Sequence, residues 1–386
     1  SLERVGIRTF RQKERNELKR YKSAVILGLE TSSTEFLEED LQELSMLLSN
    51  LGIEVVGQIV QKRESPDPAF LVGKGKALEA GLFCKSTGAD VLVSDERLTP
   101  TQKANLQSQI GIEVWDRAYV IMKIFEARAY SAEAKLQVEL ARCKYEIPHL
   151  KGLGQQMSRA GGGIGTRGPG ETEFERHRRK LERRVRDILS KLKTVRRRRE
   201  YQRKRRHKAG LLTVSLAGYT NSGKSTLLRT WSSDETLSVA DQLFCTLDTF
   251  VRRVHLPGGT EILVSDTVGF IRKLPPDLIA AFRTTLEEIT SSDLVLLILD
   301  LSVPNIMELF NVVQETLYDI GASAIARIIV LNKMDKVDNE TVNSLRDRFE
   351  HMGEKVACTS ALNGQGLDYL GDMVEKCLAS RIFYGK

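Results

Sequence analysis

A short glycine-rich segment with one lysine and one serine carries the most specific chemistry of this sequence. Its residues are Gly218, Tyr219, Thr220, Asn221, Ser222, Gly223, Lys224, Ser225 and Thr226. Glycines let backbone N–H groups approach phosphate oxygens without interference from side chains. We therefore predict a phosphate-binding loop, with Lys224 on the β- and γ-phosphates and Ser225 on a Mg²⁺ ion. The apolar run 211–217 before the loop predicts a strand, and a helix is expected to start near Thr226.

A second segment, Asp266 to Gly269, follows the apolar run 261–265. In phosphate-loop enzymes an aspartate at the end of such a strand holds Mg²⁺ through water, and a glycine N–H meets the γ-phosphate. We therefore expect Asp266 to lie near Ser225, and Gly269 to lie near the terminal phosphate.

A third segment, Asn332 to Asp335, follows the apolar run 327–331 and predicts which base is bound. Only guanine presents two adjacent hydrogen-bond donors to an accepting carboxylate, so Asp335 predicts selection of GTP over ATP. Lys333 is expected to lie across the base, and Asn332 to tie this loop to the phosphate loop. After the run 355–358 come Ser360, Ala361 and Leu362, and we expect the Ala361 N–H to contact the guanine carbonyl.

These segments occur in the order that a GTPase requires, each after an apolar strand. With the further run 294–300 they predict strands that alternate with helices, and therefore a mostly parallel sheet. We predict a Ras-like P-loop domain over residues 209–386 that hydrolyses GTP with the help of Mg²⁺.

Two threonines, Thr246 and Thr249, are candidates for the residue that coordinates Mg²⁺ and senses the γ-phosphate through its backbone. We assign this role to Thr246. The runs 251–256 and 261–265 predict a β-hairpin that couples this first switch segment to the second one, which begins at Asp266.

The residue after Gly269 is Phe270, where many GTPases place a glutamine that orients the attacking water. A phenylalanine side chain has no polar atom for this task. We therefore expect slow intrinsic hydrolysis, and a partner that orders the switch segments or supplies a polar group. The residues that decide catalysis are predicted to be Lys224, Thr246, Gly269 and Phe270.

The first 120 residues predict a small α/β domain. Apolar runs of strand type at 24–29, 53–60, 91–94 and 113–115 alternate with helical patterns. The stretch Gly73 to Lys76 could hold a phosphate at a helix N-terminus. Its spacing is not that of a phosphate loop, however, so a structural turn is the favoured interpretation.

Residues 121–208 predict two long helices that pair as an antiparallel hairpin, because apolar residues recur at helical spacing in 125–143 and in 174–195. Between Glu171 and Lys208 there are 18 Lys and Arg against 6 Asp and Glu, a larger excess than the net +7 of the whole chain. This segment predicts a surface that binds a polyanion, and on charge alone a solvated helix face is an equally good interpretation. The candidate RNA-binding residues are Arg196, Arg197, Arg198 and Arg199.

The loop between these helices, residues 158–171, holds six glycines together with Arg159 and Arg167. Three of the glycines match the dinucleotide fingerprint, but that fingerprint requires a strand before it and a helix that opens inside it. Neither pattern is found here. A glycine-rich loop with arginines can lay its backbone against folded RNA, whereas the alternative is a flexible connector. The surrounding positive charge favours RNA.

Composition sets the remaining limits. A chain of 386 residues with 41% hydrophobic residues is long enough for two or three globular domains. The longest apolar runs are much shorter than the roughly 20 residues that span a bilayer. Five scattered cysteines without a CxxC pair argue against a disulfide framework or a zinc site. We expect a monomer in the cytoplasm, with an organelle matrix as the alternative location.

The run from Ser158 to Glu173, with 135–140 before it and 243–248 after it, resembles the HflX family of translational GTPases over nearly the whole chain. The resemblance implies a protein that binds the large ribosomal subunit, whose RNA stimulates GTP hydrolysis. It implies that bacterial members separate stalled or idle ribosomes into subunits. It also implies that the hairpin tip, here Arg159 to Arg167, reaches toward the peptidyl-transferase centre. Phe270, a hydrophobic residue in place of glutamine, is a further feature in which this sequence resembles the family.

Two features depart from this family. After Asp248 the family usually continues with proline and threonine, whereas this chain has Thr249 and Phe250, which affects the geometry expected for the first switch segment. The sequence also ends soon after its last predicted helix, 367–380, so we expect the additional C-terminal domain of some relatives to be absent.

Three functions follow from this reading. The leading one is a GTP-driven factor that splits or rescues ribosomes. The second is a GTPase for assembly of the large subunit, like the Obg or Era groups. The third is an RNA-binding or remodelling module regulated by nucleotide. All three share one organisation, in which residues 1–120 form an α/β domain, 121–208 a basic helical hairpin and 209–386 the GTPase domain.

Overall fold

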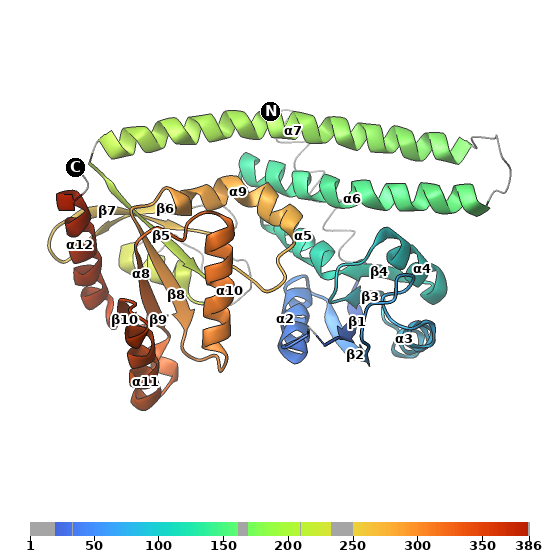
Figure 1. The fold of residues 1–386 in the computed structure, drawn as a ribbon, viewed down its shortest axis with the longest axis horizontal. Coiled ribbons are helices and arrows are strands. Elements are labelled where there is room, and N and C mark those ends of the chain that lie inside the picture. The colour runs from blue at the N-terminus through green and yellow to red at the C-terminus, as the bar shows by residue number, and fades with distance from the viewer. Residues whose placement is uncertain (1–19, 33, 161–168, 209, 233–249, 385–386) are drawn as a thin grey trace. The chain divides into compact units, whose positions relative to one another are not determined.

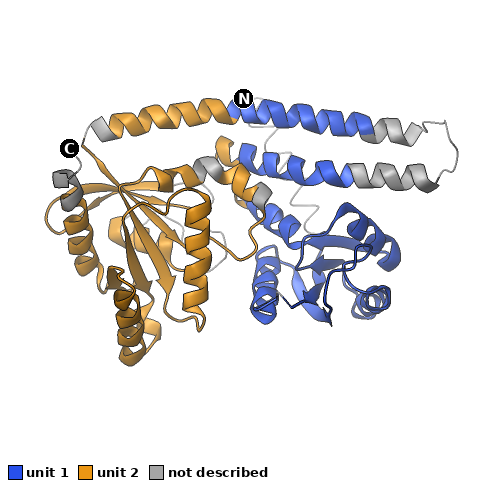
Figure 2. Cartoon of the chain, viewed as in Figure 1, with its two compact units in different colours: residues 1–127, 135–191 blue, residues 128–134, 192–386 orange. Residues whose placement is uncertain are grey.

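The structure, a computed structural model, describes residues 20–32, 34–160, 169–208, 210–232 and 250–384 and divides into two compact units (Figures 1 and 2). The first comprises residues 1–127 and 135–191, and the second comprises 128–134 and 192–386. Helix α7 (Pro169–Lys208) therefore contributes to both. The three-part division expected from the sequence is a different partition of the chain, and it stays a prediction.

The first unit contains a parallel sheet with helices between its strands. The elements are β1 (Ser23–Glu30), α2 (Leu37–Asn50), β2 (Glu54–Lys62), α3 (Lys74–Thr87), β3 (Val91–Ser94), α4 (Pro100–Ile110), β4 (Glu113–Asp116), α5 (Arg117–Arg128) and most of α6 (Ala132–Ala160). The sheet order is β2-β1-β3-β4, and all pairs are parallel. The central strand β1 is apolar and buried along 24–29, as expected when helices cover both faces of a sheet. The predicted α/β class is confirmed.

Local signals in the sequence explain where these helices begin. Thr99 caps α4 in a capping box with Gln102, because each side chain bonds the backbone N–H of the other residue. At the start of α3, the Gly73 N–H donates to Gln61 Oε1 at 2.7 Å. A side chain of the neighbouring strand β2 therefore satisfies this helix terminus, which agrees with a structural turn.

A buried ion-pair network joins the carboxyl ends of β3 and β4 to α2. Arg117 is 2% exposed, and its Nη1 donates to Asp95 Oδ1 at 2.7 Å and to the Asp40 carbonyl at 3.0 Å. Its Nη2 bonds Glu43. Removal of one member of such a network leaves a buried charge, which typically costs about 3–5 kcal/mol. The network therefore fixes α2 against the strand ends.

The long helices of the first unit differ from the expectation in one respect. The apolar stripe predicted for one helix over 125–143 is divided between α5 and α6, because Ser131 Oγ accepts the Ala134 N–H at 3.0 Å and starts a new helix. Helix α6 and the first half of α7 lie side by side (Figure 1). Arg184 of α7 forms a bidentate pair with Glu139 of α6, with distances of 2.6 and 2.7 Å.

The second unit is built on a six-stranded sheet. Its elements are β5 (Leu212–Gly218), α8 (Lys224–Ser232), β6 (Phe250–His255), β7 (Glu261–Asp266), α9 (Pro276–Thr290), β8 (Leu294–Asp300), α10 (Ile306–Asp319), β9 (Arg327–Asn332), the 3-10 helix η1 (Met334–Lys336), α11 (Asn339–His351), β10 (Val356–Cys358) and α12 (Leu367–Tyr384). The sheet order is β10-β9-β8-β5-β7-β6, with only β6 antiparallel to its neighbour. This confirms the predicted mostly parallel sheet.

Two apolar cores cover the faces of this sheet. One packs α8 and α12 against the strands, and the other packs α9, α10 and α11 (Figure 1). The strand β5 lies between β7 and β8, so its carboxyl end faces the loops that follow both neighbours. None of the helices in the described part of the chain is long and apolar enough to span a bilayer.

Candidate nucleotide site

The loop between β5 and α8 is folded so tightly that glycine is required at two positions. Gly218 has a φ of 154°, and a Cβ there would lie 2.3 Å from the Ile298 carbonyl oxygen. Gly223 has a φ of 95°, and a Cβ there would lie 2.2 Å from Asn332 Nδ2. Helix α8 begins at Lys224, two residues before the expected Thr226. The loop is therefore bounded by a strand end and a helix start, as phosphate binding requires.

The interior of this loop carries an ammonium group and two hydroxyls. Lys224 is 6% exposed, and its Nζ donates to the carbonyls of Gly218 at 3.1 Å and Tyr219 at 2.7 Å. Within the described residues, Thr220 Oγ1 and Ser222 Oγ are buried without a hydrogen-bond partner. Buried polar atoms normally have one. These groups therefore fit a phosphate chain held in the loop.

Strand β7, the neighbour of β5 in the sheet, places an acidic residue beside the loop. Asp266, at the end of β7, is 1% exposed, and its Oδ2 accepts a hydrogen bond from Ser225 Oγ at 2.6 Å. The proximity expected from the sequence is therefore present. A hydroxyl and a carboxylate are oxygen ligands of the kind that Mg²⁺ prefers. The two residues fit a magnesium ion.

The segment after Asp266 is attached to the loop through its backbone. The Thr220 N–H donates to the Phe270 carbonyl at 2.8 Å, and the Phe270 N–H donates to the Gly218 carbonyl at 3.1 Å. Gly269 lies so close that a Cβ would be 2.8 Å from Thr220 Cα. The Phe270 ring is 2% exposed and belongs to the apolar core under α9 and α10, where burial of a phenylalanine contributes about 1.5–3 kcal/mol.

Asn332 joins the phosphate loop to the loop after β10. Its Nδ2 donates to the Ser222 carbonyl at 2.9 Å, and its Oδ1 accepts from the Ala361 N–H at 2.9 Å and from Thr359 Oγ1 at 3.2 Å. The expected tie to the phosphate loop is present. The Ala361 N–H, which we expect to contact guanine, donates to Asn332 in this structure, and its role toward guanine stays a prediction.

The residues expected to read the base follow Asn332. Lys333 adopts a φ of 64° and pairs with Asp300, whose Oδ2 lies 2.7 Å from the ammonium. Asp335 lies exposed in η1, and Leu362 is 74% exposed, whereas Ser360 is buried.

Sequence reasoning missed two residues that hold this region in place. One is Asp300 at the end of β8, whose position at a strand end beside the base loop was the available signal. The other is Thr230 of α8, whose hydroxyl donates to the Ala361 carbonyl at 2.7 Å.

Other candidate residues lie outside the described part of the chain. They are Thr246 and Thr249 of the first switch segment and Arg167 of the hairpin tip, and their roles stay predictions. Arg159 lies in the last turn of α6.

The four arginines 196–199, predicted to bind RNA, have different surroundings, and their role stays a prediction. Arg196 pairs with Glu287 at 3.0 Å, and Arg199 pairs with Glu133 at 2.7 Å. Arg196, Arg197 and Arg198 are exposed, whereas Arg199 is half-buried. Arg196 and Arg199 reach acidic partners on the same side of α7 because residues three apart share a helix face and adjacent residues do not.

The strand, loop and helix around Lys224, the Ser225–Asp266 pair and the Asn332 tie together define a P-loop GTPase. Three family models match the chain: "GTP-binding GTPase N-terminal" over residues 38–126, "GTP-binding GTPase Middle Region" over 128–206 and "50S ribosome-binding GTPase" over 213–333.

Curated relatives identify the family. The chain is 43% identical over 360 residues to GTPase HflX of Caldanaerobacter subterraneus subsp. tengcongensis, with 93% of this chain and 82% of that protein covered. It is 40% identical to GTPase HflX of Escherichia coli, with 89% and 80% covered. The chain therefore belongs to the HflX family of GTPases, which confirms the predicted class of enzyme. The crystal structure of the SsGBP–GDP complex shares the fold, with a TM-score of 0.51, 24% identity, and 93% of this chain and 99% of that chain covered.

Proposed function

We propose that this GTPase binds the large ribosomal subunit and splits or rescues stalled or idle ribosomes, and that ribosomal RNA stimulates its hydrolysis of GTP. We place it where ribosomes work, in the cytoplasm or an organelle matrix, as a monomer. Family membership and the match of residues 213–333 to a 50S ribosome-binding GTPase support this proposal.

The burial of Phe270 indicates that hydrolysis needs a partner. The side chain after Gly269, Phe270, is 2% exposed and packs in the apolar core, so it cannot orient a water molecule at the nucleotide. A GTPase with this arrangement depends on an external group or on ordering of its switch segments. The exposed cations Arg197 and Arg198 support RNA as the partner that provides this stimulation.

The residues of the site divide the work as follows. Lys224 and the N–H groups of 218–226 hold the phosphates, and Asp335, Lys333 and the loop 360–362 hold guanine. Ser225, Asp266 and Thr246 would hold Mg²⁺, which neutralises phosphate charge when it is bound. Gly269 positions its N–H for the γ-phosphate, and its lack of a side chain keeps that approach open.

Sedimentation of intact ribosomes tests the function. Ribosomes are incubated with the protein and either GTP or a non-hydrolysable analogue, and the subunits are then separated. We expect subunit release with the analogue, because binding of the GTP-bound protein, rather than hydrolysis, separates the subunits. Binding only to immature large subunits would support an assembly factor instead. RNA binding unaltered by nucleotide, without preference for ribosomes, would support a remodelling module.

A pair of charge reversals tests the RNA-facing surface. Arg197→Glu with Arg198→Glu should weaken ribosome binding and lower its logarithmic salt slope by about 2, at roughly 0.7–0.9 for each lost phosphate contact. GTP affinity should be unchanged. The matched control is Arg346→Glu with Arg348→Glu on α11, which changes the net charge equally. Equal weakening by both pairs would show that only net charge matters.

A further inference from the structure

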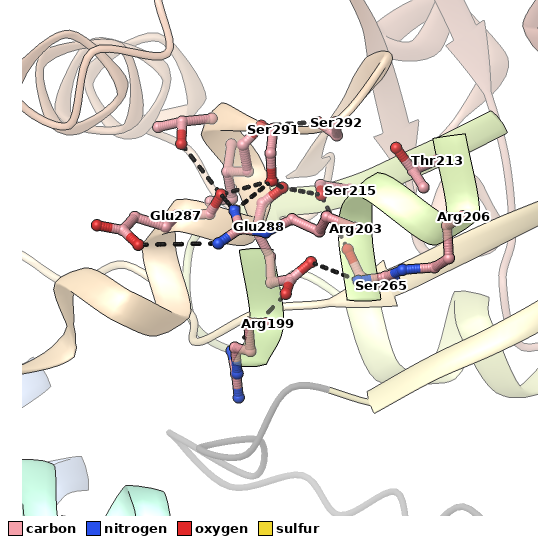
Figure 3. Close-up of polar contacts among 12 residues, drawn as sticks. Arg199, Arg203, Arg206, Thr213, Ser215, Ser265, Glu287, Glu288, Ser291 and Ser292 are labelled. Atoms are coloured by element: carbon pink, nitrogen blue, oxygen red, sulfur yellow. Dashed lines mark hydrogen bonds and ion pairs between the residues drawn. The ribbon is translucent and has the colours of Figure 1, made fainter. Parts of the chain in front are cut away.

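Four arginines of α7 at helical spacing lie near two adjacent carboxylates at the end of α9. Figure 3 shows three of them, Arg199, Arg203 and Arg206, beside Glu287 and Glu288. Arg196 and Arg203 lie within ion-pair distance of Glu287, and Arg199 and Arg206 lie within ion-pair distance of Glu288. Glu287 and Glu288 are each about one-tenth exposed, while the three arginines 199, 203 and 206 keep about one-fifth of their side-chain surface in solvent. The acids are therefore covered, and the arginine side chains keep a larger share of their surface in solvent.

The same arginines also hold the helix terminus itself. Arg203 Nη1 donates to the Glu287 carbonyl at 3.1 Å and to Ser291 Oγ at 2.9 Å, where the carbonyls of α9 end (Figure 3). A cation at this position is favoured by the partial negative charge of the helix C-terminus. Arg203 therefore fixes the position of the last turn of α9.

A chain of hydroxyls links that turn to the nucleotide site. Ser215 of β5 donates to the Glu288 carbonyl at 3.3 Å, and its Oγ lies 2.8 Å from Ser265 Oγ of β7. Ser265 directly precedes Asp266, the partner of Ser225. The start of α9 follows the same segment, after Gly269 and Phe270. Both ends of α9 are thus connected to residues beside the phosphate loop.

We propose that Glu287 and Glu288 occupy Arg203 and Arg206 in place of RNA phosphates, and that RNA displaces them and so releases the C-terminal end of α9. This rests on the proposed function, because it names the regulation of the same GTPase site by RNA. Carboxylate and phosphate oxygens are bound by guanidinium groups with the same fork geometry, so one can substitute for the other. The displaced helix end then passes the signal to β5 and β7.

The shape of the protein allows this exchange. A cavity of about 230 Å³ lies behind the arginines, lined by Arg203, Lys204, Arg206, Ser215, Ser265 and Glu288 among others. Its cationic rim, which includes the exposed Lys204, is open to an approaching phosphate.

The first test measures RNA affinity of the full chain. A fluorescent 20-nucleotide oligouridine is titrated with the wild type, with Glu287→Gln/Glu288→Gln, and with Glu315→Gln/Asp319→Asn on α10 as the control that loses the same charge. The glutamine pair removes the carboxylate partners of Arg203 and Arg206, whereas Arg196 keeps Glu200 and Arg199 keeps Glu133. We therefore expect tighter binding and a logarithmic salt slope about 1.4 units steeper, at roughly 0.7 per contact with a single strand. Affinity equal to the wild type, or equal gains in both variants, overturns the proposal.

The second test measures coupling to the nucleotide. Saturating oligouridine should change the rate of GDP release from the wild type, and the glutamine pair should release GDP at that changed rate without RNA, by reciprocity of linked binding. The charge swap Arg206→Glu/Glu288→Arg restores the pair and should return the wild-type rate while RNA affinity falls. GDP release that is insensitive to RNA in the wild type overturns the proposal. Ribosome binding retained in that case would leave the proposed function standing.

Discussion

Replacement of Asn332 by alanine should separate the phosphate loop from the loop after β10. The side chain is 1% exposed and makes three hydrogen bonds, to Ser222, Thr359 and Ala361. At about 1 kcal/mol net for each bond, Asn332→Ala should lower the free energy of unfolding by about 3 kcal/mol. Because two of the bonds set the distance between the nucleotide-binding loops, GDP affinity should also fall by at least about tenfold, or about 1.4 kcal/mol.

Urea unfolding without nucleotide and titration with a fluorescent GDP analogue measure the two effects. Thr359→Val is the control, since it removes only the longest of the three bonds. It should cost about 1 kcal/mol and leave GDP affinity within about threefold. An Asn332→Ala protein that loses stability but binds GDP as tightly as the wild type would refute the claim that this residue spaces the loops.

Three further predictions concern single substitutions. Gly223→Ala places a Cβ against Asn332 at a φ of 95°. Because strain and clash each cost at least about 1–2 kcal/mol, GDP affinity measured by calorimetry should fall more than about 100-fold. Retained binding would show that the loop can open. Asp335→Asn should shift the nucleotide preference from guanine toward xanthine in competition binding, and surviving GTP selectivity would contradict its role. Burial lowers the pKa of His149 below its usual 6.5, with the Tyr145 carbonyl opposing and Lys103 adding to the shift. Stability is therefore complete above about pH 6.5 and declines as the pH falls toward the folded-state pKa, a slope in the urea midpoint that His149→Gln should remove.

The sequence predicted the nucleotide site because each motif there is local. Lys224 and Ser225 belong to a glycine-rich loop after one strand, and Asp266 follows the neighbouring strand. Because the two strands are parallel, their carboxyl ends lie at the same edge of the sheet and bring these residues together. The four strands of the first unit were likewise readable, since each is a short apolar run between turn signals.

The parts that could not be predicted depend on contacts between distant segments. Arg199 and Arg206 look like solvated charges in the sequence, and their partner Glu288 lies more than 80 residues away on a helix with other acids. Periodicity shows which residues share a face but not what that face meets. The bond between the Ala361 N–H and Asn332 could not be predicted for a similar reason, because it joins two loops that follow different strands.

The anchoring of Phe270 limits how the enzyme could be redesigned. Its main chain is bonded on both sides to the phosphate loop, and its ring is held in the core. A glutamine placed there would have to bury its amide among apolar side chains or pull the backbone away from Gly218 and Thr220. A faster, self-sufficient hydrolase therefore cannot be obtained by one exchange at this position, and any engineered acceleration has to deliver the missing polar group from another segment or from a second molecule.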